Sequence, residues 1–108
     1  MTALERLGLE VAAFQLLGTR SKAATLCALI NAAGVAITYD AIANARVWMG
    51  EHDAANPVNV ARTRVCLLRE SLEDVGLGDV IQNIKGHGYA LQEPGRSRVL
   101  ARLVEVAA

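Results

Sequence analysis

The feature that most constrains the fold is a long amphipathic segment that begins at Asn56-Pro57 and ends before Gly76. Asn is a favoured helix N-cap, Pro is favoured at the first helical position, and Gly is favoured just beyond a helix C-terminus. Between these signals apolar residues recur every three or four positions, at Val58, Ala61, Val65, Leu68, Leu72 and Val75. This spacing predicts one helix over residues 57–75, with its apolar seam packed against a core.

The polar side of this helix is divided into a basic and an acidic half. Residues 56–69 contain three arginines and no acid, whereas residues 70–79 contain four acids and no base. Opposite the seam lie Asn59, Arg62, Thr63, Cys66 and Glu70, with Arg64 and Arg69 on the flanks. Because arginine pairs well with guanine and asparagine with adenine, we expect the first turns to contact double-stranded DNA. A solvated helix face would carry the same residues, so this interpretation depends on the elements that come after the helix.

Two short apolar segments come next, around Val80–Ile84 and Tyr89–Gln92, and a connector with two glycines joins them. Glycine permits positive φ in a tight turn, so the pattern predicts a β-hairpin. Lys85, Gly86 and His87 form its predicted tip, which we expect to enter a minor groove or touch phosphate. A hairpin turn that happens to be basic is the simpler alternative. The Gly-x-Gly sequence is not a nucleotide-binding loop, because no helix N-terminus comes after it.

Two helices are predicted before the long one. The first covers Lys22–Ala33 and ends at Gly34, and the second covers Tyr39–Arg46, with Thr38 as its cap and Ile42 as its anchor. The expected apolar face of the first helix consists of Leu26, Leu29, Ile30 and Ala33. A helix, a short extended connector and a short helix form the scaffold half of a helix-turn-helix variant.

The two ends of the chain each carry an apolar stripe. Residues 3–17 have apolar positions at helical spacing, which favours a helix, although the alternation Leu7, Leu9, Val11 would also suit a strand. The first stripe consists of Leu4, Leu7, Val11, Phe14 and Leu17. Residues 96–106 are predicted to form an amphipathic helix whose apolar side consists of Val99, Leu100, Leu103 and Val104.

Three pieces of the sequence resemble the C-terminal effector domain of OmpR/PhoB-type transcription regulators. The hairpin shows that family's pattern of hydrophobic residues and glycines, in Ile81, Ile84, Gly86, Gly88, Tyr89 and Leu91. Residues 65–72 resemble the end of the family's recognition helix, and Val47-Trp48 with Gly50 resembles the start of its helix-connecting loop. The resemblance covers about residues 21–94.

The resemblance implies a mainly α winged helix-turn-helix, in which three helices are closed by a C-terminal β-hairpin, the wing. It implies a DNA-binding transcription regulator with the recognition helix in the major groove and the wing in the adjacent minor groove. It also implies that the loop of residues 47–56 contacts RNA polymerase. Trp48 is expected to pack on the core, which leaves the exposed contact surface to Met49, Glu51, His52 and Asp53. Phosphate contacts are expected from the arginines of the recognition helix and from Arg20 or Lys22.

The chain also departs from the family pattern. Family members usually carry an N-terminal receiver domain and a small sheet before the first helix, whereas residues 3–17 favour a helix here. Glu70-Ser71 replaces a basic stretch, and the helix after the wing is additional. We therefore expect a stand-alone relative with three parts: residues 1–18, the winged helix of residues 19–94, and residues 95–108. The terminal helices are expected to form a homodimer in place of the receiver.

Composition and residue spacing argue against several other classes of protein. No apolar run is long enough for a membrane span, and two distant cysteines, Cys27 and Cys66, indicate a reducing cytoplasm. No two Cys or His residues have zinc-ligand spacing, and no nucleophile has an identifiable base, so we expect neither metal, cofactor nor enzymatic activity. The net charge is zero, which predicts weak non-specific DNA binding by a monomer. It also favours the alternative of a winged-helix interaction module that binds RNA polymerase or another regulator without DNA.

Overall fold

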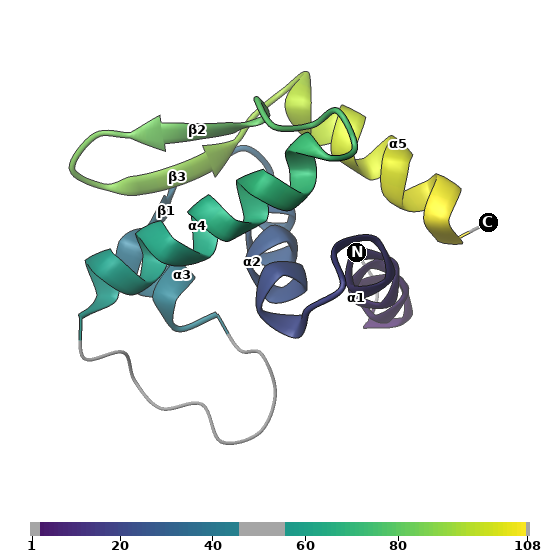
Figure 1. Ribbon diagram of the computed structural model, residues 1–108, viewed down its shortest axis with the longest axis horizontal. Helices are drawn as coiled ribbons and strands as arrows, with labels where there is room; N and C mark the ends of the chain where they lie inside the picture. Colours follow the sequence, from purple (N-terminus) through teal and green to yellow (C-terminus); the bar gives the residue numbers. More distant parts are fainter. Residues whose placement is uncertain (1–2, 46–55, 108) are drawn as a thin grey trace.

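The computed structural model describes residues 3–45 and 56–107 of the chain (Figure 1). These residues form five helices and one small sheet, which confirms the mainly α class. The helices are α1 (Ala3–Leu17), α2 (Arg20–Asn31), α3 (Tyr39–Ala43), α4 (Pro57–Glu73) and α5 (Gly95–Ala107). The strands are β1 (Ile37–Thr38), β2 (Ile81–Ile84) and β3 (Gly88–Leu91).

The sheet is antiparallel and has the strand order β1-β3-β2, so it extends the predicted hairpin by one strand. Ile37 of β1 pairs with Tyr89 of β3, and Ile84 of β2 pairs with Gly88. The prediction of a hairpin was correct for β2 and β3, and residues 35–38 were expected to be extended, but the pairing of β1 with β3 was not predicted. A strand of two residues is too short to show an alternating pattern, so only its partner reveals it.

The two hairpin glycines serve different purposes. Gly86 has a φ of 71° and occupies the turn, as predicted. Gly88 lies in β3, where the backbone of β1 approaches closely. A Cβ atom on Gly88 would overlap the carbonyl oxygen of Ile37 and lie 2.8 Å from its carbonyl carbon. The second glycine is therefore required for strand pairing rather than for the turn.

Four of the six residues of the predicted α4 seam lie at the centre of the core, whereas Val58 is exposed and Val75 is only partly buried. Ala61, Val65, Leu68 and Leu72 are completely buried, together with Leu26, Leu29 and Ile30 of α2, Ile42 of α3 and Leu91 of β3. The helix begins as predicted, since the side chain of Asn56 accepts a hydrogen bond from the Asn59 amide at 3.4 Å. It ends at Glu73, two residues early, where the Leu77 amide donates to the Leu72 carbonyl at 2.8 Å.

The two helices before α4 differ in how closely they match their predicted bounds. Helix α3 starts at its expected cap, where Thr38 accepts a hydrogen bond from the Ala41 amide at 3.1 Å. Helix α2 starts at Arg20 and ends at Asn31, because Ala33 and Gly34 both adopt positive φ and turn the chain. Ala33 was predicted to lie on the buried face of this helix and is instead exposed in that turn. The predicted end of α3 at Arg46 lies outside the described residues.

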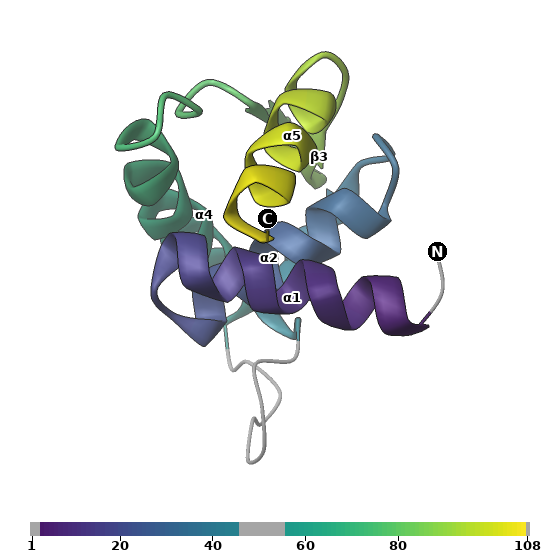
Figure 2. The ribbon, with the colours of Figure 1, turned by 90° about the vertical axis from the view of Figure 1, so that its right-hand side faces the viewer.

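Helix α1 buries Leu17 of its predicted apolar stripe, but the rest of its described buried face consists of alanines and not of Val11 and Phe14. Ala12, Ala13 and Leu17 are buried, whereas Val11 and Phe14 are 49% and 44% exposed. The stripe was expected inside because large apolar residues are usually buried. Helix α1 instead packs against α2 and α5 (Figure 2), and alanines permit a close approach between helices. The predicted stripe therefore remains on the surface at Val11 and Phe14.

Helix α5 is anchored by its apolar side and by two arginines. Val99 and Leu103 are buried, while Val104 stays exposed. Arg96 donates to the Ile30 carbonyl at 3.1 Å, and Arg98 donates to the Gly76 carbonyl at 3.0 Å. Most of the apolar stripe predicted for residues 96–106 is therefore packed against the rest of the protein. Within the described residues, no helix has the length and apolar character needed to cross a membrane.

The two thiols differ in environment, which leads to a prediction about alkaline pH. Cys66 is exposed, whereas burial, with a smaller effect from Glu10, raises the pKa of Cys27 from 9.0 to about 11. A raised folded-state pKa favours the neutral thiol, so this contribution to stability is complete below pH 9 and is lost as pH rises towards 11. Wild type should therefore lose about 2 kcal/mol more than Cys27→Ala between about pH 8 and about pH 10.5, as measured by urea unfolding. An equal loss in both proteins would contradict this assignment.

Candidate functional site

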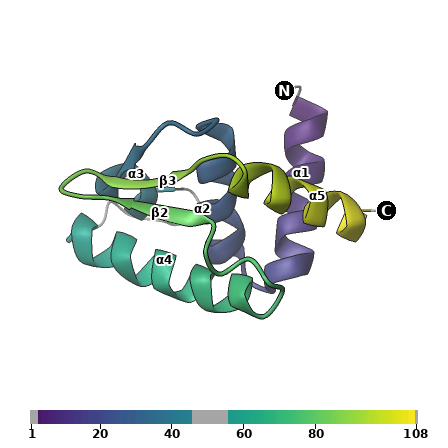
Figure 3. The same cartoon turned by 90° about the horizontal axis from the view of Figure 1, so that it is seen from above.

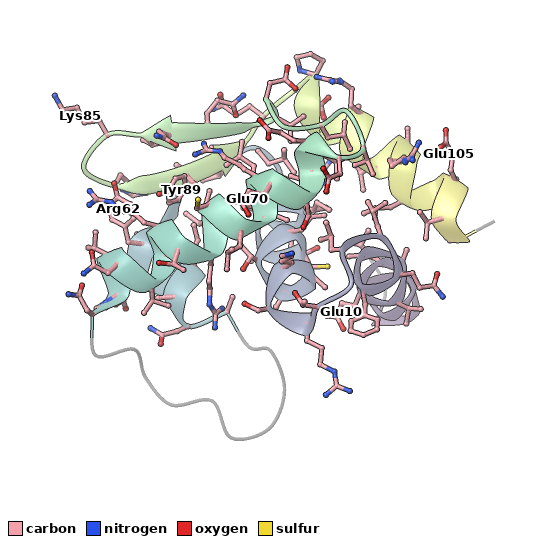
Figure 4. The ribbon with its side chains drawn as sticks, viewed as in Figure 1. Glu10, Arg62, Glu70, Lys85, Tyr89 and Glu105 are labelled. Carbon is pink, nitrogen blue, oxygen red and sulfur yellow. The ribbon has the colours of Figure 1, made fainter. Side chains whose placement is uncertain are left out.

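The exposed side of α4 and the β2–β3 hairpin lie side by side, and the hairpin tip projects past the N-terminal half of the helix (Figures 1 and 3). Asn59, Arg62, Thr63 and Cys66 are all exposed along this part of α4. Lys85 stands at the hairpin tip and points away from the domain, and Arg62 lies between the helix and the hairpin (Figure 4). We use the name basic end for the surface formed by these residues of α4 and of the hairpin tip: Asn59, Arg62, Thr63, Cys66, Lys85, Gly86 and His87.

The hairpin tip is held by hydrogen bonds from its own backbone. The His87 amide donates to the Ile84 carbonyl at 3.0 Å, which closes the turn. The His87 carbonyl in turn accepts from the Tyr39 amide at the start of α3, at 3.1 Å. The side chains of Lys85 and His87 remain exposed. The tip therefore presents the side chains of Lys85 and His87 from a backbone that is hydrogen-bonded to the start of α3.

Arg64, which we expected to contact DNA, faces the interior side of α4. It is half-buried, and its guanidinium donates to the Ile42 carbonyl at 3.2 Å and to the Ala45 carbonyl at 2.9 Å. Ile42 lies in α3, and Ala45 lies two residues beyond the end of that helix. Arg64 thus joins α3 to α4, and the structure does not bring it together with the basic end.

Arg69, the other flanking arginine, is also engaged within the domain. Its guanidinium donates to the Ile81 carbonyl at 2.8 Å and to the side chain of Asn83 at 2.6 Å. The same group lies 5.7 Å from the centre of the Tyr89 ring. Arg69 therefore fastens α4 to strand β2, so the orientation of the hairpin relative to the helix depends on it.

Two tyrosines that were not among the predicted site residues, Tyr39 and Tyr89, each lie beside the guanidinium of an arginine. The Arg62 guanidinium lies 5.9 Å from the centre of the Tyr39 ring. The Tyr39 and Tyr89 rings meet edge to face, with centres 5.7 Å apart and planes at 85°. Burial raises the pKa of Tyr89, and the neighbouring Tyr39 adds to that effect, while Arg69 and Arg62 oppose it. The raised pKa favours the neutral phenol of Tyr89, whose ring lies beside the Arg69 guanidinium.

The charges on α4 are separated along its length, as the sequence indicated. Glu70, Glu73 and Asp74 are exposed towards the C-terminal end of the helix, and Glu70 lies well back from the hairpin tip in Figure 4. Asp40, next to Tyr39 in α3, is an exposed acid closer to the basic end. An anionic partner would therefore meet the hairpin tip and the first turns of α4 more favourably than the last turn.

The remaining predicted site residues fall elsewhere. Arg20 and Lys22 lie in the first turn of α2, next to the end of α1 and away from the hairpin tip (Figure 1). The predicted partner-binding residues Met49, Glu51, His52 and Asp53 lie outside the described residues, as does Trp48. Within residues 3–45 and 56–107, no group of His, Cys, Asp or Glu side chains could hold a metal ion.

The described residues define a mainly helical domain with a small three-stranded antiparallel sheet and a basic end formed by one helix and one hairpin. Comparisons with protein-family models, with curated proteins and with solved structures gave no match.

Proposed function

We propose that this protein is a sequence-specific DNA-binding regulator of transcription, built as a winged helix of the OmpR/PhoB type. The observation that carries the proposal is the basic end, where exposed Asn59, Arg62 and Thr63 of α4 stand beside the hairpin tip with Lys85. A helix with such side chains suits the major groove, and a basic tip beside it suits the neighbouring minor groove. The protein is proposed to act in the cytoplasm, without a cofactor.

The arrangement of elements supports this proposal. Helices α2, α3 and α4 pack around one core, and the β2–β3 hairpin comes directly after α4. Helix α4 has 17 residues, which corresponds to a length of about 25 Å, so its first half can enter a groove while its second half packs on the core. The hairpin then takes the position of the wing, and α4 takes that of the recognition helix.

The contacts of the arginines narrow the expected interface. Arg64 and Arg69 donate to carbonyls within the domain, which leaves Arg62 and Lys85 as the cations best placed to meet DNA. Each neutralised phosphate contributes about 0.9 to the slope of log affinity against log salt, so a monomer should show a shallow slope. Affinity sufficient for regulation would then require two copies on one DNA molecule.

One observation favours a second candidate, the protein-interaction module. Leu67 is 45% exposed and Val58 is 37% exposed on α4, and neither has an evident use against DNA. Exposed apolar side chains on a helix are common at protein interfaces. In this alternative, α4 would bind a polymerase subunit or another regulator, and the arginines would only support the fold.

The experiment that separates the two candidates is selection from a pool of random duplex DNA at about 100 mM salt, where phosphate contacts are weakened but not abolished. Wild type should enrich a motif, and Arg62→Ala should lower affinity for that motif by about tenfold or more. Arg102→Ala, which removes an exposed arginine of α5 that pairs with Glu105, is the charge-matched control. A folded wild type that enriches nothing would overturn the proposal and support the interaction module.

Lys85 tests the wing separately. Its position at the hairpin tip suits a phosphate rather than a base edge, so Lys85→Ala should weaken binding to all sequences about equally. The slope of log affinity against log salt should fall by about one unit. Titrations of selected and unrelated duplexes over a range of salt concentrations would measure this, and an unchanged slope would remove the hairpin from the interface.

We further propose that α1 provides the contact between two copies. Its outward face carries Val11 and Phe14, while the apolar side of α5 is already buried at Val99 and Leu103. Phe14→Glu should therefore convert a dimer to a monomer in sedimentation at tens of micromolar, because a charge would be buried in the interface. Val35→Glu, at an exposed apolar residue in the turn after α2, is the matched control. A monomeric wild type would refute the proposal.

A further inference from the structure

Tyr39 contacts both parts of the basic end, helix α4 and the hairpin tip, and also strand β3. Its backbone amide donates to the His87 carbonyl of the hairpin at 3.1 Å. Its ring lies 5.9 Å from the guanidinium of Arg62 on α4, and its edge-to-face contact with Tyr89 joins it to strand β3. Tyr39 is the first residue of helix α3. One residue thus contacts the hairpin tip, the sheet and the exposed arginine of α4.

The contacts continue beyond Tyr39 in an ordered series. Tyr89 is buried and lies between Tyr39 and the guanidinium of Arg69, which donates in turn to the Ile81 carbonyl of β2. The two arginines therefore lie at the ends of a row whose middle members are the two aromatic rings. Arg69, at the inner end, is fixed by hydrogen bonds, whereas Arg62, at the outer end, is exposed and has the ring of Tyr39 as its neighbour.

The ring limits the freedom of a side chain that would otherwise be mobile. An exposed arginine has many rotamers, and restricting them on binding costs free energy. A cation near an aromatic face is attracted to the ring, and Arg also stacks well on such a face. Arg62 is therefore partly oriented before any partner arrives. Because Tyr39 also holds the His87 carbonyl, the same residue sets the position of the hairpin tip relative to Arg62.

We propose that Tyr39 is a positioning residue for DNA recognition, which orients the Arg62 guanidinium and fixes its distance from the hairpin tip. This inference rests on the proposed function and assigns a role to a residue that does not itself touch the DNA. The edge-to-face contact of Tyr89 keeps the Tyr39 ring in place, and Arg69 completes the support from the side of the sheet.

The test changes the electron density of the ring while preserving its size. Tyr39→Phe, and then Phe analogues at position 39 that carry an increasing number of fluorine atoms, weaken the attraction for a cation step by step. Affinity for the selected duplex should remain within about twofold for Tyr39→Phe and fall about fivefold with full fluorination. In the Arg62→Ala background the same series should leave the remaining affinity unchanged, since no guanidinium is present to be oriented.

The outcomes separate the two proposals. If wild type enriches no motif, the proposed function fails, and the role of Tyr39 fails with it. If wild type binds its motif but the fluorinated series has no effect, or an equal effect with and without Arg62, only the positioning role is overturned. Circular dichroism of every variant accompanies the titrations. A further readout is the chemical shift of the Arg62 side-chain Nε–H, which should move in the free protein when the ring is changed.

Discussion

Replacing Gly88 by alanine is expected to destabilise the domain by about 3 kcal/mol or more, the largest effect that we predict for a single methyl group. The added Cβ would overlap the carbonyl oxygen of Ile37 and lie 3.0 Å from the carbonyl carbon of Thr38. These are backbone atoms of β1, so no side chain can rotate away to relieve the overlap. Strand β1 would have to separate from β3.

Urea unfolding followed by circular dichroism would measure this effect, and the neighbouring glycine supplies the control. Gly86→Ala adds the same methyl group at a φ of 71° with no heavy atom within 4 Å, so its cost should be about 1 kcal/mol. The two substitutions thus compare steric overlap with backbone strain in one hairpin. If Gly86→Ala proved the more harmful, the assignment of Gly88 to strand pairing would be wrong.

Replacing Arg69 by methionine is expected to cost about 2–3 kcal/mol, although Arg69 lies on the helix that we propose to contact DNA. Methionine keeps an apolar stem of similar length but removes the donors to the Ile81 carbonyl and to Asn83. It also removes the cation beside the Tyr89 ring, worth about 0.5–1 kcal/mol at a partly exposed position. Helix α4 and strand β2 would lose their polar connection.

The expected result separates a structural arginine from a DNA-contacting one. Arg69→Met should lower the urea midpoint clearly, whereas Arg102→Met, at an exposed arginine paired with Glu105, should change the free energy of unfolding by less than about 0.5 kcal/mol. Arg62→Ala should resemble Arg102→Met in stability while weakening DNA binding. An Arg69→Met protein as stable as wild type would mean that its hydrogen bonds to β2 contribute nothing.

Helix α4 and the hairpin could be predicted from the sequence because local signals agreed with one another. The cap at Asn56, the proline after it and the apolar seam all point to the same helix start and the same buried face. The third strand could not be predicted in this way. Ile37 and Thr38 form a strand only because β3 lies beside them, and the sequence signal for that pairing is Gly88, far away along the chain.

The orientation of α1 shows where periodicity misleads. Val11 and Phe14 lie on a different face of this helix from Ala12 and Ala13, and the alanine face is the buried one. Burial of the two alanines allows α1 to pack closely on its neighbours, whereas Val11 and Phe14 would hold the helices apart. The spacing of large hydrophobic residues cannot predict this orientation. It identifies the helix face with the largest apolar side chains, but not the face that allows the closest approach of another helix.

The same limit applies to the candidate site. Sequence position placed Arg62, Arg64 and Arg69 on or near the polar face of one helix, and all three lie in α4. Only tertiary structure distinguishes them, since α3 supplies a carbonyl to Arg64 and β2 supplies one to Arg69. The two tyrosines could not be selected either, because nothing in the local sequence brings Tyr39 and Tyr89 together.

The pairing of β1 with β3 has a consequence for how the protein is made. Residue 37 emerges from the ribosome well before its partner, residue 89, which emerges only after α3, α4 and β2 have been synthesised. Closing so long a loop is slow compared with forming a helix. Until then the backbone groups of β1 have no strand to pair with, and Tyr39 has no hairpin carbonyl for its amide. The surface that we propose for DNA recognition is therefore completed only after strand β3 has been synthesised.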